Sequence, residues 1–272
     1  GDNVTIDRAN LVRIEADDDR TLEAETYSVS AGAITAGASV ATTSIGGATG
    51  ASVGAGARIG QGVYDVNDVE VSADANHAAS AEATAGKAGL GLAASGTVAT
   101  ASINPVVSAS IGNSGAIAVQ NGVDIDAVAR VAANAQATGI NVSLGGSVGA
   151  SIARATASPQ VSASLGTNTN VVADDLLVRA RQLLPAGGYA ANASATGAAG
   201  GLLVGVNATS ALARNTATVL ASVGGGSTLA ASGSSTVSAE NNTSQRAVVT
   251  GISVGIVALG ANLADAESNT VT

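Results

Sequence analysis

The sequence contains no cysteine, methionine, phenylalanine or tryptophan, and it has only three tyrosines. Without cysteine there can be no disulfide framework and no thiolate metal site. A globular core in a chain of 272 residues is ordinarily filled by bulky aromatic and aliphatic side chains, most of which are missing. We therefore expect an architecture whose layers lie close together and are filled by alanine, valine and serine.

Charge is also sparse, and it is mostly of one sign. Only 11% of the residues are charged, with 11 basic against 20 acidic residues and a net charge of −9. This balance excludes a partner that is recognised through its phosphate backbone, such as nucleic acid. At 46% hydrophobic residues the chain is too apolar to be disordered.

The segment most easily mistaken for a membrane helix is Ala247–Ala264, which has 18 uncharged residues. Its glycines and β-branched residues have low helix propensity, and a related segment occurs in each of the repeats described next. We therefore expect strands here rather than a membrane helix, and no insertion of the chain into a membrane.

Three short patterns recur in the same order along the chain. The pattern Ala-Ser-aliphatic-Gly recurs at spacings of 58, 54 and 58 residues, starting at Ala51, Ala109, Ala163 and Ala221. An alternating aliphatic-polar pattern that ends in alanine is found at Val12–Ala16, Val69–Ala73, Val123–Ala127, Leu176–Ala180 and Ser235–Ala239. An aliphatic-Ala-polar pattern starts at Val40, Val98, Ile152, Leu212 and Leu263.

These patterns predict a single segment of about five tandem units of roughly 54 residues. The approximate units are residues 1–53, 54–111, 112–165, 166–223 and 224–272. The last residues could continue in phase into the first. We therefore expect an excerpt from a longer array, or a unit that stacks end to end on copies of itself.

The period within each unit indicates strands. Small apolar and polar residues alternate with period two in Ser80–Ala85, Ala133–Thr138 and Val161–Leu165. The predicted fold is all-β: a β-solenoid, and specifically a right-handed parallel β-helix. We expect about four short strands and two or three coils per unit, with five units spanning roughly 50 to 70 Å. Stacking pairs every strand except those at the two ends, and it should align Ser52, Ser110, Ser164 and Ser222 in one ladder.

Arrays that combine Val-x-Val-x-Ala, Ala-x-Ala-x-Gly and Ala-Ser-aliphatic-Gly in this order resemble the repeat regions of large exported bacterial adhesins. The resemblance is to the filamentous-haemagglutinin and leukotoxin-like type, and it covers the whole chain. It implies an extracellular β-helical shaft, exported through an outer-membrane pore, that projects a separate adhesive or toxic tip.

Catalytic chemistry has little support in the sequence. Two Gly-x-Ser-x-Gly matches, around Ser52 and Ser147, have the pattern of a hydrolase nucleophile. Ser52 is one copy of a repeated position, however, and the only histidine available as a base is His77. We expect His77 to lie in a surface turn, and we expect no catalytic residue.

Calcium is the only metal for which the chain offers ligands, because calcium needs oxygen ligands alone. The candidates are Asp17, Asp18 and Asp19, expected in the turn after the first strand, and Asp174 and Asp175. Neither group has the spacing of a known calcium loop, so solvated acidic turns are the simpler interpretation. We expect no cofactor.

Arg179 and Arg181, close in sequence to Asp174 and Asp175, form the only mixed cluster of charges. Such a cluster occurs in polysaccharide-cleaving β-helix enzymes, but opposite charges on neighbouring coils explain it more simply.

The expected function is structural: a rigid, secreted shaft or fibre segment of a bacterial surface adhesin, without catalysis. The alternative is a binding module that uses one solenoid face for a glycan, a receptor or ice, and a remote alternative is a polysaccharide-cleaving enzyme. The expected partners are neighbouring repeats or copies of the chain. Contact with host or matrix glycans is expected only through regions outside this segment.

Overall fold

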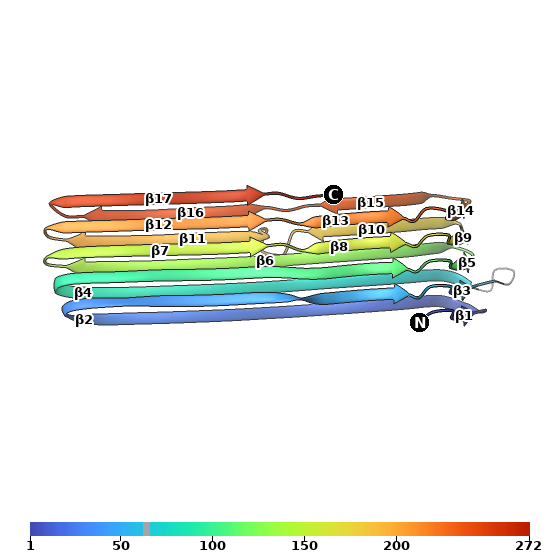
Figure 1. The fold of residues 1–272 in the computed structure, drawn as a ribbon, viewed down its shortest axis with the longest axis horizontal. Coiled ribbons are helices and arrows are strands. Elements are labelled where there is room, and N and C mark those ends of the chain that lie inside the picture. Colours follow the sequence, from blue (N-terminus) through green and yellow to red (C-terminus); the bar gives the residue numbers. More distant parts are fainter. Residues whose placement is uncertain (62–65) are drawn as a thin grey trace.

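A computed structural model describes residues 1–61 and 66–272, and within these residues the chain forms 17 strands and no helix. Each of the first two layers is one long strand that runs out, turns back and returns (Figure 1). These strands are β2 (Ala9–Val53) and β4 (Val66–Ile111).

The later layers follow the same path with interruptions. The outward strands are β6 (Gly122–Ser143), β10 (Asp175–Leu183) with β11 (Ala191–Gly201), and β15 (Ser235–Asn241) with β16 (Gln245–Val254). The return strands are β7 (Gly146–Ala157) with β8 (Gln160–Leu165), β12 (Val204–Asn215) with β13 (Thr218–Val223), and β17 (Val257–Ser268).

A second, smaller sheet closes the end of the stack opposite the long turns (Figure 1). It contains the short strands β1 (Thr5–Ile6), β3 (Arg58–Ile59), β5 (Ala116–Ala118), β9 (Asn170–Ala173) and β14 (Thr228–Ala231). The strands β3, β5, β9 and β14 each connect a return strand to the next outward strand, and β1 leads into β2, so that one layer consists of a short strand, an outward strand and a return strand.

All the paired strands are parallel, and the partner of a residue lies about one sequence repeat away. Val12 pairs with Val69, and Val69 pairs with Val123. The all-β class and the parallel pairing are thus confirmed. The expectation of two or three coils per unit is wrong, because each repeat is used up by one pass out and back along strands much longer than expected.

The long axis of the molecule consequently runs along the strands (Figure 1). The strand path β2–β4–β6–β10–β15 stacks five layers, which at ~4.8 Å per layer extend only about 20 to 25 Å. The expected length of 50 to 70 Å along the stack is therefore wrong as well. The segment Ala247–Ala264 lies in β16, β17 and their turn, and the described residues include no helix long and apolar enough to cross a membrane.

The interior changes in character along the strands. Near the small sheet it is filled by valine, isoleucine and leucine, including Ile125, Val71 and Val178 in register. The middle is filled almost entirely by alanine, as at Ala81 and Ala135. Because alanine is small, the two long sheets can approach each other closely in the middle, as expected from the shortage of bulky residues.

The glycine of the Ala-Ser-aliphatic-Gly pattern marks a close approach between layers. A Cβ atom on Gly166 would lie 2.5 Å from the carbonyl carbon of Gly112, and one on Gly112 would lie 2.8 Å from that of Gly54. The turn that follows contains a residue with positive φ in every layer, namely Asn3, Gly56, Ser114, Asn168 and Gly226. The repeated pattern thus encodes a tight corner at which the backbones of successive layers nearly touch.

Candidate functional site

The four serines of the repeat lie in one column. Ser52 pairs with Ser110, Ser110 with Ser164, and Ser164 with Ser222. Their neighbours on either side point into the core, so the serines point outward on the return sheet. A position repeated at equivalent places in four layers has the geometry of a structural ladder.

The two Gly-x-Ser-x-Gly serines lie in different environments. Ser147 is fully buried and faces the interior, whereas Ser52 points outward. His77 is 1% exposed in the middle of β4, and its Nε2 lies 3.1 Å from Asp18 Oδ2. The expected surface turn is therefore wrong, because β4 continues straight through this position and its alternation directs His77 between the sheets. Its Nδ1 has no hydrogen-bond partner among the described residues, so neither serine is paired with a base.

Asp18 forms the centre of a polar cluster inside the stack. Its Oδ1 accepts a hydrogen bond from Arg20 Nε at 2.8 Å, and its Oδ2 accepts one from Thr49 Oγ1 at 3.1 Å. Burial acts to raise the pKa of Asp18, but the hydrogen bonds from Arg20, Thr49 and His77 outweigh it and hold the pKa below its ordinary value. The cluster ties the outward and return strands of the first layer to His77 in the second.

The three aspartates Asp17, Asp18 and Asp19 lie within β2, so their expected place in a turn is wrong. Alternation along the strand separates their side chains, because Asp18 points inward while Asp17 and Asp19 point outward. Asp19 accepts a hydrogen bond of 3.4 Å from Asn76 Nδ2 on the next layer. A strand cannot bring three consecutive carboxylates to one cation.

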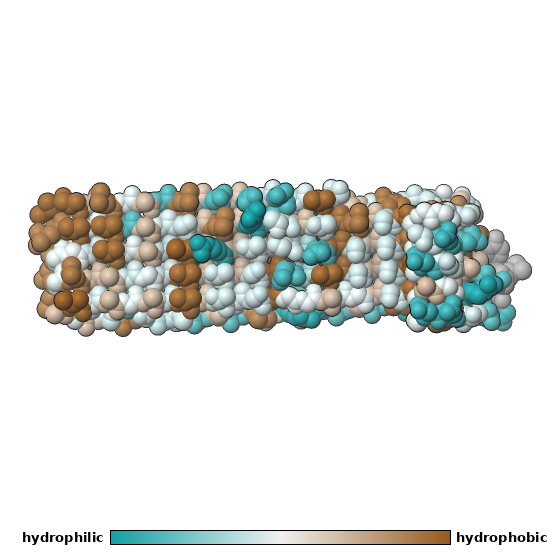
Figure 2. Space-filling view, in the orientation of Figure 1, coloured by the Kyte–Doolittle hydropathy of each residue, from teal (hydrophilic) through white to brown (hydrophobic). Residues whose placement is uncertain are grey.

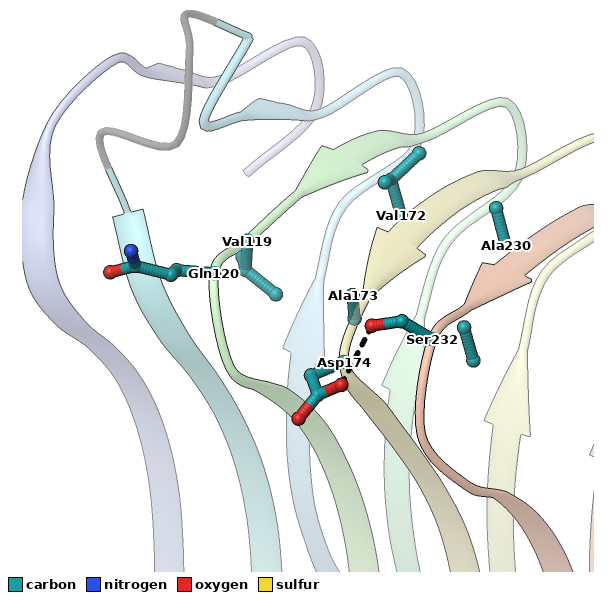
Figure 3. A pocket seen from close by; sticks show the side chains of 8 residues that line it. Val119, Gln120, Val172, Ala173, Asp174, Ala230 and Ser232 are labelled. Atoms are coloured by element: carbon teal, nitrogen blue, oxygen red, sulfur yellow. Dashed lines mark hydrogen bonds between the residues drawn. The ribbon is translucent and has the colours of Figure 1, made fainter.

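Asp174 lines a shallow groove of about 430 Å³ at the end of the molecule opposite the long turns (Figure 3), and Asp175 follows it as the first residue of β10. Asp174 Oδ1 accepts a hydrogen bond of 2.7 Å from Ser232 Oγ, and the side chain of Gln120 lies on the same groove. Asp175 Oδ1 accepts hydrogen bonds from both the backbone N and the Oγ of Ser234, and these lower its pKa. Both carboxylates therefore fix the corner of the following layer.

The two arginines predicted near these aspartates bind a different carboxylate. Arg179 and Arg181 contact Asp126 Oδ2 on the neighbouring layer, at 3.0 and 2.6 Å. The hydrogen bond with Asp126 raises the pKa of Arg179. Burial, and then the negative charge of Asp126, raises the pKa of Asp124 on the same strand. This arrangement is a cross-layer charge ladder.

The two tyrosines that the structure describes, Tyr27 and Tyr189, lie in different layers and do not form a common surface. Tyr27 is exposed on β2 in the first layer, and Tyr189 lies in the fourth, with Arg246 5.9 Å from the centre of its ring. Tyr64 lies outside the described residues. Across residues 1–61 and 66–272 no group of three or more histidine, aspartate or glutamate side chains is arranged to hold a metal ion.

No protein-family model, no curated protein and no solved structure matches this chain significantly. The fold and the placement of residues within it therefore carry the evidence for function.

Proposed function

We propose that this chain is a structural segment of a secreted bacterial surface adhesin or fibre, and that it acts as a rigid spacer without catalysis. Its architecture in this proposal is a right-handed solenoid of five tandem units. The observation that carries the proposal is the in-register stacking of equivalent residues through successive layers, as in the serine column. Continuous hydrogen-bonded ladders resist bending because every layer is joined to the next along its whole length.

The sequence resemblance to exported filamentous adhesins supports the extracellular location, and the lack of cysteine is compatible with it. The charged side chains also support a structural role. Those of Asp126, Arg179 and Arg181 are engaged with one another across layers.

The open faces of the stack support assembly with further copies. The first-layer strand β2 pairs only with β4, while β15 and β16 in the last layer pair only with β10 and β11. Each open edge presents unpaired backbone groups, which favour pairing with another chain. We propose that the last layer of one copy stacks on the first layer of the next, which lengthens the fibre along the stacking direction.

This joint can be tested through charge. The column of Glu23 continues through Ser80, Asn134 and Asn192 to Arg246. A copy stacked in register would place Arg246 directly over Glu23 of the next copy. Opposite charges on paired strands stabilise the pairing, and like charges oppose it.

We expect Glu23→Arg to shorten the fibres seen by electron microscopy and to shift sedimentation toward single copies. The double variant Glu23→Arg with Arg246→Glu should restore assembly, because it reverses both charges. Glu25→Arg is the matched control, since its column ends at the uncharged Val248. Equal effects of Glu23→Arg and Glu25→Arg, or no rescue by the double variant, would contradict the stacking.

A further inference from the structure

The end of the molecule at which the long strands turn back is almost free of charge. We define this turn end as residues 27–38, 84–96, 138–151, 196–209 and 249–262. Its only charged residue is Lys87, which is buried between the sheets with its Nζ donating a hydrogen bond of 2.6 Å to Ser28 Oγ. The outer surface of the turn end therefore carries no charge.

The alternation of apolar and polar residues is inverted at the turn end. Along β6 and its turn, Ile140, Val142 and Leu144 are 48%, 56% and 63% exposed, whereas Asn141 between them is fully buried. Soluble proteins place apolar side chains inside and polar ones outside, as this chain does nearer the small sheet. At the turn end the polar side chains face the interior and the apolar ones face outward.

The inversion extends through the stack. Three outward columns are formed by Val29, Gly86, Ile140, Ala198 and Ile252; by Ile34, Leu92, Gly146, Val204 and Val257; and by Ala36, Ala94, Val148, Val206 and Leu259. Two inward columns, at the turn end and at its border, are formed by Ser30, Lys87, Asn141, Ala199 and Ser253, and by Ser39, Thr97, Ser151, Thr209 and Asn262.

The apolar surface that results is large. Figure 2 shows hydrophobic residues gathered over the turns of the stack, while hydrophilic residues gather toward the other end. More than a dozen valine, leucine and isoleucine side chains of the turn end are exposed. Each of these side chains exposes roughly 100 Å², so their total exposed area exceeds the ~300–600 Å² of the largest apolar patch on a typical soluble monomer. An apolar surface of this size favours a water-free environment.

The backbone groups of the inner layers form hydrogen bonds at the turns, as a water-free environment requires. At the turns, the amide of Leu144 donates to the carbonyl of Gly89, and the amide of Leu203 donates to that of Gly145. In the flanking strands, the backbone groups form the hydrogen bonds of the parallel ladders. Because these backbone groups of the inner turns have partners in neighbouring layers, taking them out of water costs less than it would for unpaired groups.

We propose that the turn end inserts into the acyl-chain region of one leaflet of a lipid membrane. The exposed apolar side chains extend four residues on either side of Leu144, to Ile140 and to Val148. At ~3.3 Å per residue this is a depth of about 13 Å, which is comparable to the ~15 Å of one leaflet.

The border of the apolar region fits the edge of that layer. The next outward column contains Tyr27 and four threonines, and tyrosine favours the boundary between acyl chains and water. The column after it begins with Glu25 and Glu82, whose charges would stay in water.

A lipid phase fits this surface better than a second copy of the chain does. Val142 lies on the outward sheet and Val148 on the return sheet, so the apolar side chains cover both faces of the stack as well as its end. A flat protein surface could cover only one of these sides, whereas acyl chains surround all of them. The open edges of the first and last layers are the remaining polar cost, and insertion depends on the stacking proposed above to cover them.

This inference replaces the sequence-based expectation that the chain does not insert into a membrane. That expectation considered only a helical span at Ala247–Ala264. The same residues form the strand, turn and strand of the last layer at the turn end, and Ile252, Val254 and Ile256 are exposed there.

The experiment uses the whole chain and vesicles of zwitterionic phosphatidylcholine. Because the chain has no cysteine, Val142→Cys can be labelled at a single position with an environment-sensitive fluorophore, and Leu220→Cys, exposed at the other end of the stack, serves as the control. We expect the label at Val142 alone to shift to the blue with vesicles and to be quenched by spin labels on the acyl chains.

A second comparison measures co-flotation with the same vesicles. Leu90→Ser with Leu144→Ser should lower partitioning at least about tenfold, because it removes two exposed leucines from the apolar surface. The matched pair Leu11→Ser with Leu220→Ser, exposed leucines outside the turn end, should leave it unchanged.

Three results would overturn the proposal: failure of the unmodified chain to float with vesicles, equal quenching at both labelled positions, or lipid-independent dimers that the Leu90→Ser, Leu144→Ser variant abolishes. The last would assign the surface to a second copy. Failure of the proposed stacking would appear separately, in the comparison without lipid, as equal effects of Glu23→Arg and Glu25→Arg or as no rescue by the double variant.

Discussion

The aliphatic part of the interior should carry a large share of the stability, and Ile125 is the sharpest place to test it. Ile125 lies in the central layer, is 0% exposed, and stacks between Val71 and Val178. Ile125→Ala removes three carbon atoms, worth about 0.8 kcal/mol each in transfer free energy. The flanking layers are tied to long ladders and cannot collapse fully into the space, which adds a cavity term. We expect a loss of about 3 to 4 kcal/mol in the free energy of unfolding.

The measurement is equilibrium denaturation followed by circular dichroism in the strand region. Ile140→Ala is the matched control, because it makes the same chemical change in the same strand at a side chain that points outward. In water we expect Ile140→Ala to lower the free energy of unfolding by less than about 1 kcal/mol. If the two substitutions cost the same, the assignment of inner and outer faces along β6 is wrong, and with it the inverted alternation at the turn end.

Three further predictions test the layers and the charges. Gly166→Ala should lower the melting temperature by several degrees, because its Cβ would strike the backbone of the previous layer, whereas Gly225→Ala, with open space around its Cβ, should not. Asp124→Asn should raise stability at pH 7, because a raised pKa means that the ionised form is disfavoured in the fold, and the gain should vanish as the pH falls below about 4 in thermal melts. Asp18→Asn should lower stability at pH 7. The lowered pKa of Asp18 contributes stability above the ordinary value of 3.8, and this contribution is lost as the pH falls through the lowered value.

The repeat and the strand class could be predicted from the sequence because they depend on periodicity alone. The alternation at Ala133–Thr138 has period two, and the structure places it in a strand. The glycine at the end of Ala-Ser-aliphatic-Gly was visible as a marker, and the contact between layers at Gly112 and Gly166 gives its physical reason.

The length of the strands could not be predicted in the same way. Glycine clusters such as those near Gly46 and Gly86 are typical of turns, which suggested several short strands per unit. In the structure these residues lie inside β2 and β4. The neighbouring layers supply the ladder hydrogen bonds, on one side of β2 and on both sides of β4, and this tertiary pairing overrides the low strand propensity of glycine.

The polar cluster around His77 was missed for a related reason. The residues Asp18, Arg20 and Thr49 meet His77 only after the first layer has folded back on itself and stacked on the second. Asp18 and His77 are 59 residues apart, which is close to one repeat. Comparison of equivalent positions in successive units would have placed Arg20, Asp19 and His77 close together on adjacent strands, since Arg20 pairs with His77.

The turn end shows a more general limit of reading alternation. Period two divides a strand into two sets of side chains, but it does not state which set lies inside. Near Ile125 the hydrophobic effect decides, because the apolar set gains most from burial. At Ile140 and Val142 the apolar set remains outside, because the same strand continues from the aliphatic zone of the interior around Ile125. To bring these residues inside, the strand in every layer would have to shift by one residue. The register is thus decided by the aliphatic zone, and the outward apolar set then needs an environment of its own, which acyl chains supply.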